Sequence, residues 1–393
     1  MTESLVLDLI LIAVLIAYIV YGFRHGLSRS IFVIAGVVAG VVAAFFLAPL
    51  AATWVPVAFL RPAVTIFVAI GLVGLGHALG GAIGRRVRRG VARSPLGGFD
   101  RVLGALVTGI AAALVASVVA FSAGQLGVPV LSKAIAGSTI LRTISTFTPD
   151  PVQALLAQVR AAVIDRGIPL ITEALGDETG TIPQIDTGSP ALNTAAQSIV
   201  RITGNAYACG RSQSGTGFVI SDDRIITNAH VVAGVSEPVI EAPDGEVVTG
   251  SIVYFDPIDD LAVISAPGLT AAAIAQVGSV TAGTDVVVQG YPYGGPFTSG
   301  AAGVISVSTA RIADIYSVTS TDREVYTLAA TVREGNSGGP VLTLDGRVTG
   351  VVFARSADND EVGYAMTMAE LGPVASQAPA LVEAVSTGNC ITE

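Results

Sequence analysis

Histidine and cysteine are scarce in this chain, whose 393 residues include three histidines and two cysteines. Two of the histidines, His25 and His77, lie in segments so apolar that we expect them within a membrane. No group of cysteines and histidines has the spacing of metal ligands, so we expect no metal and no cofactor. Chemistry in the soluble region that needs a histidine base must therefore use His230.

Charged residues are also few, at 13% of the chain, and they are unevenly distributed. Residues 1–127 carry nine arginines against three acidic residues, whereas the remainder carries 12 basic and 27 acidic residues. An acidic soluble region argues against a nucleic acid partner, which a basic surface would bind. The sequence thus predicts a basic membrane region followed by an acidic soluble region.

Four apolar segments in residues 1–127 are each close to the ~20 residues that a helix needs to cross a bilayer. They cover residues 5–21, 31–52, 63–83 and 102–121 and predict four transmembrane helices. A cleaved signal peptide is the alternative for the first segment, but no basic residue precedes it and no small-residue cleavage site follows it. Arginines concentrate in the first and third connections, which places these in the cytoplasm and the soluble region outside it.

Glycines recur at every fourth position in the second and third segments, at Gly36, Gly40, Gly76, Gly80 and Gly84. This spacing lets helices approach closely, either within one bundle or between two copies of the chain. His77 either has a functional role at membrane depth or bonds a backbone carbonyl. The arginine-rich third connection and residues 98–104 resemble the membrane domain of the colicin V production protein family.

Residues 128–192 are expected to connect the membrane region to the soluble domain. Asp150 and Pro151 are typical of a helix N-cap and a first helical position, and they predict a helix that ends at Gly167. Residues 176–190 are rich in glycine, threonine, aspartate and proline, which predicts an exposed linker.

Residues 193–393 read as an all-β domain, because short β-rich runs alternate with turn signals. Six runs cover residues 198–202, 215–220, 224–228, 239–242, 247–254 and 261–265, and six more cover 285–291, 301–310, 325–332, 339–344, 347–354 and 363–366. The turn pairs Asp244-Gly245 and Asp345-Gly346 indicate hairpins. The pattern predicts two antiparallel barrels, with a terminal helix near residues 378–385.

Ser337 stands in the run Gly335-Asn336-Ser337-Gly338-Gly339, between two predicted strands. A serine among glycines is by itself more often a tight turn than a nucleophile. Here His230 and then Asp260 precede it, and the order His, Asp, Ser is one of the known orders of the hydrolytic triad. We therefore expect Ser337 as nucleophile, His230 as base and Asp260 as the carboxylate that orients the base. Asp259 is the alternative carboxylate.

These segments resemble the chymotrypsin-type and HtrA-like serine proteases. The resemblance implies a chymotrypsin-like double β-barrel, with the site in the cleft between the barrels, and serine endopeptidase activity. The serine loop would supply an oxyanion hole from Gly335, Asn336 and Ser337. The substrate pocket would include Thr331, Val352, Phe353 and Ala354, and it would favour a small or medium apolar side chain.

Asn336 occupies the position where trypsin-type zymogens need an aspartate to pair with a new amino terminus, so that route of activation is not expected. HtrA-like proteases usually carry a PDZ domain as well, for which the 56 residues after Ser337 leave no room. Cys209 and Cys390 are most simply a disulfide outside the cytoplasm, and a redox switch is the alternative role.

Taken together, the chain resembles the membrane-anchored actinobacterial periplasmic serine proteases of the MarP type. This implies a role in acid and oxidative stress and in cell-envelope processing, with periplasmic proteins such as cell-wall enzymes as substrates. The linker is a candidate site of self-cleavage. Two rival functions are a catalytically idle peptide-binding sensor that signals through the helices and a small transporter that uses His77.

Overall fold

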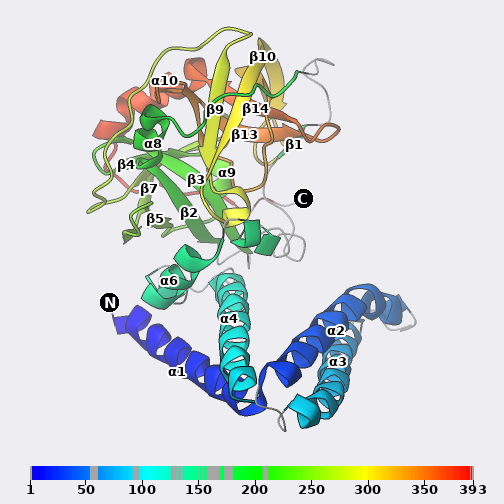
Figure 1. The fold of residues 1–393 in the computed structure, drawn as a ribbon. Helices are drawn as coiled ribbons and strands as arrows, with labels where there is room; N and C mark the ends of the chain where they lie inside the picture. The colour runs from blue at the N-terminus through cyan, green and yellow to red at the C-terminus, as the bar shows by residue number, and fades with distance from the viewer. Residues whose placement is uncertain are drawn as a thin grey trace. The chain divides into compact units, whose positions relative to one another are not determined.

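The computed structural model describes residues 2–53, 61–91, 97–124, 131, 134–135, 137–149, 151–153, 155–156, 169–171, 180–206, 211–389 and 391. The chain divides into two compact units (Figure 1). One unit is Asp8–Ser117, and the other combines Met1–Leu7 with Val118–Glu393. Cys209 and Cys390 lie outside the described residues, so their disulfide stays a prediction.

Four long helices occupy the first third of the chain: α1 (Thr2–His25), α2 (Leu27–Thr53), α3 (Arg61–Val91) and α4 (Gly97–Gly124). Among the described residues, three segments are long and apolar enough to cross a membrane: Ser4–His25, Leu27–Ala44 and Gly97–Ala120. Apolar side chains of these helices are exposed, as at Ile16 (55%) and Val115 (62%), which suits contact with lipid. Three of the four predicted spans are thus supported, and the span at residues 63–83 stays a prediction.

Glycines bring α2 and α3 into close contact. A Cβ atom added to Gly76 would overlap the carbonyl oxygen of Gly36, and one added to Gly80 would overlap that of Phe32. A Cβ on Gly74, in the same helix, would have nothing within 4 Å. The small-residue stripe of α3 therefore packs against α2 within one chain, the first of the two alternatives that the sequence left open.

The connector contains a helix that the sequence did not reveal, α6 (Thr139–Phe147), and Ser138 caps it by accepting a hydrogen bond of 3.1 Å from the Leu141 N–H. Residues 151–153 and 155–156 are helical, as expected after Asp150, and the rest of that predicted helix lies outside the described residues. The short strand β1 (Leu170–Ile171) follows and pairs in parallel with β13 (Val348–Ser356).

The predicted exposed linker is only partly exposed at residues 180–189. This segment is extended, and its side chains alternate between exposed and half-buried. Ile185 packs against the core, and the carbonyl oxygen of Thr187 accepts a hydrogen bond of 2.9 Å from the Ser299 hydroxyl. Pro183, Ile185 and Thr187 are spaced two apart and are half-buried, whereas Gln184 and Asp186 between them are exposed, so one face of the segment is directed to the β-domain. The helix α8 (Pro190–Ala196) follows it.

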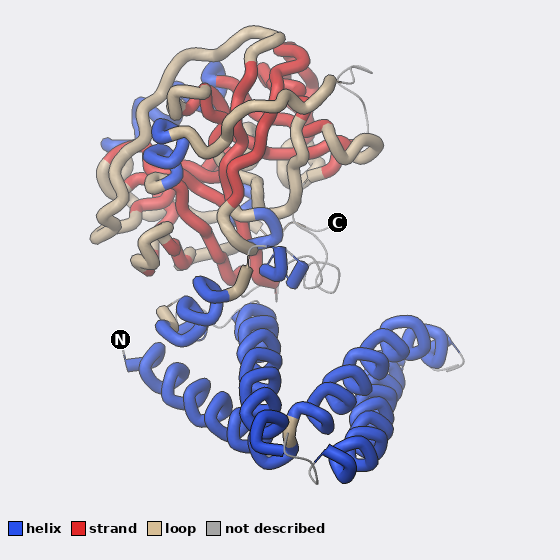
Figure 2. The backbone as a smooth tube through the Cα atoms, viewed as in Figure 1, coloured by secondary structure: helices blue, strands red, loops and turns tan. Residues whose placement is uncertain are grey.

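The β-domain contains two seven-stranded sheets, which Figure 2 shows as the strand-rich part of the chain. The first has the order β6-β5-β2-β3-β4-β8-β7. Its strands are β2 (Ile199–Ala206), β3 (Arg211–Ser221), β4 (Arg224–Thr227), β5 (Val239–Glu241), β6 (Val247–Thr249), β7 (Ser251–Asp256) and β8 (Leu261–Ser265). The predicted strand at residues 247–254 is two strands separated by Gly250, where a Cβ would crowd Ile264 and Ile240.

The second sheet has the order β1-β13-β12-β9-β10-β11-β14, and an additional pairing of β13 with β14 closes it. Besides β1 and β13 it contains β9 (Asp285–Gly290), β10 (Thr298–Ala313), β11 (Ser320–Ala329), β12 (Pro340–Thr343) and β14 (Val362–Thr367). The predicted runs match these strands closely. A closed first barrel stays a prediction.

The terminal helix lies earlier than expected, at α10 (Met368–Gln377), followed by a 3-10 turn at Ala378–Ala380. The predicted helix at residues 378–385 is therefore wrong beyond that turn. Residues 381–385 instead run along the first sheet, where the Val385 N–H donates a hydrogen bond of 2.9 Å to the Ile252 carbonyl.

Candidate active site

His230 and Asp260 are joined by two hydrogen bonds. His230 lies in the short helix α9 (Ala229–Val232), directly after β4, and Asp260 directly precedes β8. The Nδ1 atom of His230 is 2.7 Å from Oδ2 of Asp260, and the His230 backbone N–H donates to Oδ1 at 2.9 Å. Because an ionised carboxylate only accepts, Nδ1 carries the proton and Nε2 is left as an acceptor.

The conformation of the turn before β8 determines which aspartate side chain forms hydrogen bonds with His230. Asp260 has a left-handed backbone (φ 53°), and the Asn228 side chain donates a hydrogen bond of 2.9 Å to its carbonyl oxygen. Asp256 closes the turn by accepting a hydrogen bond from the Asp259 N–H at 3.1 Å. The side chain bonded to His230 is that of Asp260 and not that of Asp259.

Ser337 lies in a tight loop between β11 and β12 of the second sheet. Strand β3 of the first sheet forms hydrogen bonds to this loop. The Thr216 N–H, from β3, donates to the Ser337 carbonyl at 2.9 Å, and the Thr216 hydroxyl donates to the Gly335 carbonyl at 2.6 Å. A Cβ on Gly338 (φ 79°) would overlap Thr216 and Thr227, so this close approach requires glycine.

Ser337 Oγ and His230 Nε2 are both buried without a hydrogen-bond partner among the described residues. Ser337 is 1% exposed and His230 is 6% exposed. Buried polar atoms without partners are rare and unfavourable, and they concentrate at functional sites. The two atoms do not bond each other here, and catalytic hydrogen bonds often form only when substrate is bound.

The backbone N–H groups of Gly335 and Ser337 donate no hydrogen bond within the described part of the chain. Gly335 has φ 85°, and a Cβ there would overlap the Tyr291 carbonyl oxygen, so only glycine fits this conformation. Asn336 differs from its two neighbours, because its N–H already donates to the Arg333 carbonyl at 3.0 Å. Of these three consecutive residues, Gly335 and Ser337 are therefore the ones whose N–H groups have no acceptor in the described part of the chain.

Of the four residues expected to form the substrate pocket, Thr331 lines a described cavity, and the pocket as a whole stays a prediction. Thr331 is exposed and lines a cavity of about 170 Å³, together with Ile182, Val288, Thr298, Gly300, Ala301, Ala330 and Asn336. Val352, Phe353 and Ala354 lie on β13 and are at most 2% exposed. The cavity includes Ile182 from the connector, a contribution that the linker prediction missed.

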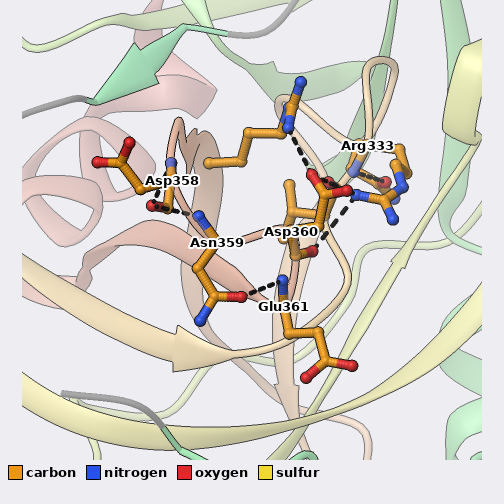
Figure 3. A network of polar contacts seen from close by, with 9 residues as sticks. Arg333, Asp358, Asn359, Asp360 and Glu361 are labelled. Carbon is orange, nitrogen blue, oxygen red and sulfur yellow. Dashed lines mark hydrogen bonds and ion pairs between the residues drawn. The ribbon is translucent and has the colours of Figure 1, made fainter. Parts of the chain in front are cut away.

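Charged residues tie the Ser337 loop to the turn between β13 and β14, as Figure 3 shows. Asp360 pairs with Arg355 at 3.0 Å and with Arg333 at 3.5 Å, and its carbonyl oxygen accepts a hydrogen bond from Arg333 at 3.3 Å. The same turn is closed by Asn359, which accepts from the Glu361 N–H at 3.0 Å. Asp360 is 71% exposed on its side chain, so these pairs orient the loop more than they stabilise it.

Sequence reasoning missed Thr216, which fixes the serine loop through two hydrogen bonds and whose hydroxyl also accepts one from the Tyr291 N–H. The signal was present, because Thr216 lies between Gly215 and Gly217 in a predicted strand, where glycines mark a close approach of another backbone. A Cβ on Gly215 would in fact crowd Val231 and the Ser337 carbonyl.

Both parts of the chain match families of known proteins. A family model of the trypsin-like peptidase domain matches residues 215–351, and one of the colicin V production protein matches residues 7–149. The chain is 33% identical over 320 residues to the serine protease Rv3671c of Mycobacterium tuberculosis, which covers 79% of each chain. It is 27% identical over 219 residues to the serine protease Do-like HtrA of Bacillus subtilis, covering 51% of this chain and 49% of the relative.

A solved structure agrees with the sequence matches. The crystal structure of the active form of the Rv3671c protease from M. tuberculosis has a TM-score of 0.51 and 34% identity, and it covers 56% of this chain and 100% of that one. Fold, site geometry and sequence similarity now agree. The chain is a serine endopeptidase and belongs to the family of the mycobacterial serine protease Rv3671c, with a colicin V production protein-like N-terminal region and a trypsin-like protease domain.

Proposed function

We propose that the protein is a membrane-anchored, extracytoplasmic endopeptidase that cleaves peptide bonds with Ser337, His230 and Asp260. In this mechanism Ser337 Oγ attacks the scissile carbonyl while His230 Nε2 takes its proton. The imidazolium then donates that proton to the leaving amine, and Asp260 holds the ring in the required tautomer. The observation that carries the proposal is the bond from His230 Nδ1 to Asp260, which leaves Nε2 as an acceptor, and Nε2 and the buried Ser337 Oγ both have no partner among the described residues.

The oxyanion that forms during attack would be bound by the N–H groups of Gly335 and Ser337. Both groups are without an acceptor among the described residues, and the left-handed Gly335 sets their direction. Each donor of such a pair contributes about 3 kcal/mol to lowering the barrier. Asn336 takes part indirectly, by fixing the turn between them.

A fluorophosphonate probe tests the triad in the full-length protein. It should label the wild type, and Ser337→Ala and His230→Ala should abolish labelling. Ser308→Ala, which removes a serine of β10 away from this loop, should label as the wild type does. Labelling that persists in Ser337→Ala would show that another residue is the nucleophile.

The site would face the extracytoplasmic side. Three apolar helices support an anchor, and the arginines near the connections support the orientation. A reporter fused after Glu393 that is active only outside the cytoplasm checks this arrangement, and a reporter active only in the cytoplasm would reverse it. Substrates would be periplasmic proteins, including cell-wall enzymes, in a response to acid and oxidative stress that the relatives' family suggests.

Self-cleavage in the connector is a separate part of the proposal. The candidate segment is the linker at residues 176–190, in which Thr181, Gln184, Asp186 and Gly188 are exposed. Purified protein should lose its N-terminal region on long incubation, whereas Ser337→Ala should stay intact. Cleavage of both proteins at the same rate would point to a contaminating protease.

A further inference from the structure

Strand β13 has an edge that begins beside the serine loop. Strand β14 pairs along one side of β13, and β12 pairs along the other side only with residues 348–351. The next residue on that side, Val352, bonds the serine loop: its N–H donates to the Gly339 carbonyl and its carbonyl accepts from the Gly338 N–H, both at 2.9 Å. The part of this edge beyond Val352 therefore starts next to Ser337.

The connector strand β1 lies on this same edge of β13 (Figure 1). Arg355 pairs with β14 on one side and with Leu170 on the other, so β1 and β12 share the edge opposite β14. The Arg355 N–H donates to the Pro169 carbonyl at 3.2 Å, and the Ala357 N–H donates to the Ile171 carbonyl at 3.1 Å. Ile171 also packs against the buried core, whereas Leu170 is 54% exposed. Two backbone hydrogen bonds and one apolar side chain therefore hold β1 on the edge.

Strand β1 is close to the serine loop when the distance is followed along β13. Arg355 comes three residues after Val352, which is about 10 Å of extended strand. The unpaired N–H and C=O groups of a strand edge bind extended peptides by adding them as a further strand. A peptide whose scissile bond lies at Ser337, and whose backbone follows this edge, therefore reaches β1 after about three residues.

We propose that β1 competes with extended polypeptide substrates for the edge of β13, so that a substrate with more than about three residues on this side of its scissile bond must displace β1. The inference rests on the proposed function, because it presupposes that Ser337 cleaves peptide bonds. The substrate class is extended or unfolded polypeptide, since only an extended backbone pairs with a strand edge. A small reagent that reacts with Ser337 does not use the edge, so β1 leaves that reaction unaffected.

The competition is effective because β1 belongs to the same chain as the edge that it occupies. Residues 180–189 follow it and are fixed to the β-domain through Ile185, which keeps β1 at a high local concentration. Each backbone hydrogen bond favours docking by a factor of about 2–10. The apparent affinity for a substrate falls with the fraction of molecules whose edge is free, so two such bonds predict an effect of about tenfold.

The test compares Ile171→Asp, which puts a charge where an apolar side chain packs against the core, with Leu170→Asp. Leu170 is its neighbour in β1 and is exposed, so this control adds the same charge without removing a core contact. The quantities measured on each full-length protein are kcat and KM for fluorescein-labelled casein, an unfolded polypeptide, and the rate of fluorophosphonate labelling.

For Ile171→Asp we expect KM for casein to fall about tenfold, with kcat and the labelling rate within about twofold of wild type. Leu170→Asp should match the wild type in all three. An unchanged or higher KM in a folded Ile171→Asp protein would overturn the proposal, and so would a labelling rate that rises as much as casein cleavage, which would place the effect at the triad. An equal fall of KM in Leu170→Asp would also overturn it, because added charge and not the release of β1 would be the cause.

The proposed function is checked in the same experiment. A wild type that is labelled, with casein kinetics that Ile171→Asp leaves unchanged, would overturn this inference alone. A wild type that is neither labelled nor cleaves casein would remove the proposed function and this inference together.

Folding is checked separately by the melting temperature. If Ile171→Asp does not fold, Ile171→Gly takes its place, because it removes the core contact without adding a charge, and Leu170→Gly is then the control. Failure of both Ile171 variants to fold would make β1 a required part of the folded domain and would overturn the proposal.

Discussion

Asn336 and Arg333 form a closed ring of two hydrogen bonds within the serine loop. The Arg333 N–H donates to Oδ1 of Asn336 at 2.9 Å, and the Asn336 N–H donates to the Arg333 carbonyl at 3.0 Å. The ring fixes the turn that precedes Ser337 and directs the Gly335 N–H. An uncharged asparagine thus orders this loop from within, where trypsin-type enzymes need an ion pair with a new amino terminus.

We therefore expect Asn336→Ala to lower the free energy of unfolding by about 1 kcal/mol, because the Arg333 N–H loses its acceptor. Its kcat should fall about tenfold or more, since the oxyanion donors are less well ordered. Arg333→Ala is the control: it keeps the ring, which uses only the backbone of Arg333, and removes the side-chain contacts to Asp360 and to the Val332 carbonyl. Equal losses in the two variants would mean that the ion pair, and not the ring, orders the loop.

Replacing each of the two adjacent aspartates separates their roles. Asp260→Asn should lower kcat by about 10⁴-fold, because the amide no longer enforces the tautomer that leaves Nε2 as the acceptor. Asp259→Asn should keep kcat within about threefold, since its side chain is not bonded to His230. The measurement is kcat on one peptide substrate, and a larger loss in Asp259→Asn would reverse the assignment.

Asp259 should also make stability depend on pH. Burial raises its pKa, and the charges of Asp256 and Glu370 raise it further, whereas Arg323 lowers it. A raised pKa means that the folded state binds the proton more tightly, so the group favours folding at low pH and opposes it as pH rises through the folded pKa. Asp259→Asn should therefore melt at a higher temperature than wild type at neutral pH. The difference should shrink as pH falls toward 4, and a constant difference would contradict this.

Most of the β-domain could be predicted from the sequence because its signals are local. Strand periodicity and turn residues located all six strands of the closed sheet, from β9 to β14, within a few residues. The same signals failed where a segment depends on distant partners. Residues 180–189 have the composition of a linker, yet Ile185 packs against the core and the Thr187 carbonyl accepts a hydrogen bond from Ser299, more than 100 residues later in the chain.

The sequence allowed the catalytic residue types to be predicted, but not how the backbone arranges them in space. With one histidine in the soluble region, His230 was the only choice, whereas the choice between Asp259 and Asp260 required the left-handed turn at Asp260. Val352, Phe353 and Ala354 were expected in the substrate pocket; all three are buried on β13, and their place in the pocket stays a prediction. Strand alternation alone does not tell whether a β13 side chain faces a cleft or the core.

In the helical unit, Gly76→Val should disrupt the packing of α2 against α3, because the new side chain would overlap the Gly36 carbonyl. Gly74→Val is a matched control, since a Cβ there has nothing within 4 Å. We expect the melting temperature in detergent to fall by about 4 °C or more for Gly76→Val and to change little for Gly74→Val. Equal changes would show that helix propensity, and not close packing, decides the effect.

Gly335→Ala tests the oxyanion hole with a control that separates strain from chemistry. Gly335 and Gly283 have nearly the same left-handed φ, 85° and 83°, so alanine should cost about 1 kcal/mol of backbone strain at either position. A Cβ on Gly335 would also overlap the Tyr291 carbonyl, whereas one on Gly283 would have nothing within 4 Å. Only Gly335→Ala must move the loop.

We expect both variants to lose similar backbone stability, with a further loss at Gly335 from the displaced loop. Only Gly335→Ala should lose about 10²–10³-fold in kcat, the effect of removing one oxyanion donor. KM should change much less, because the N–H of Gly335 binds the transition state more strongly than the substrate. If kcat fell equally in both variants, general destabilisation of the domain would explain the loss, and the Gly335 N–H would have no part in catalysis.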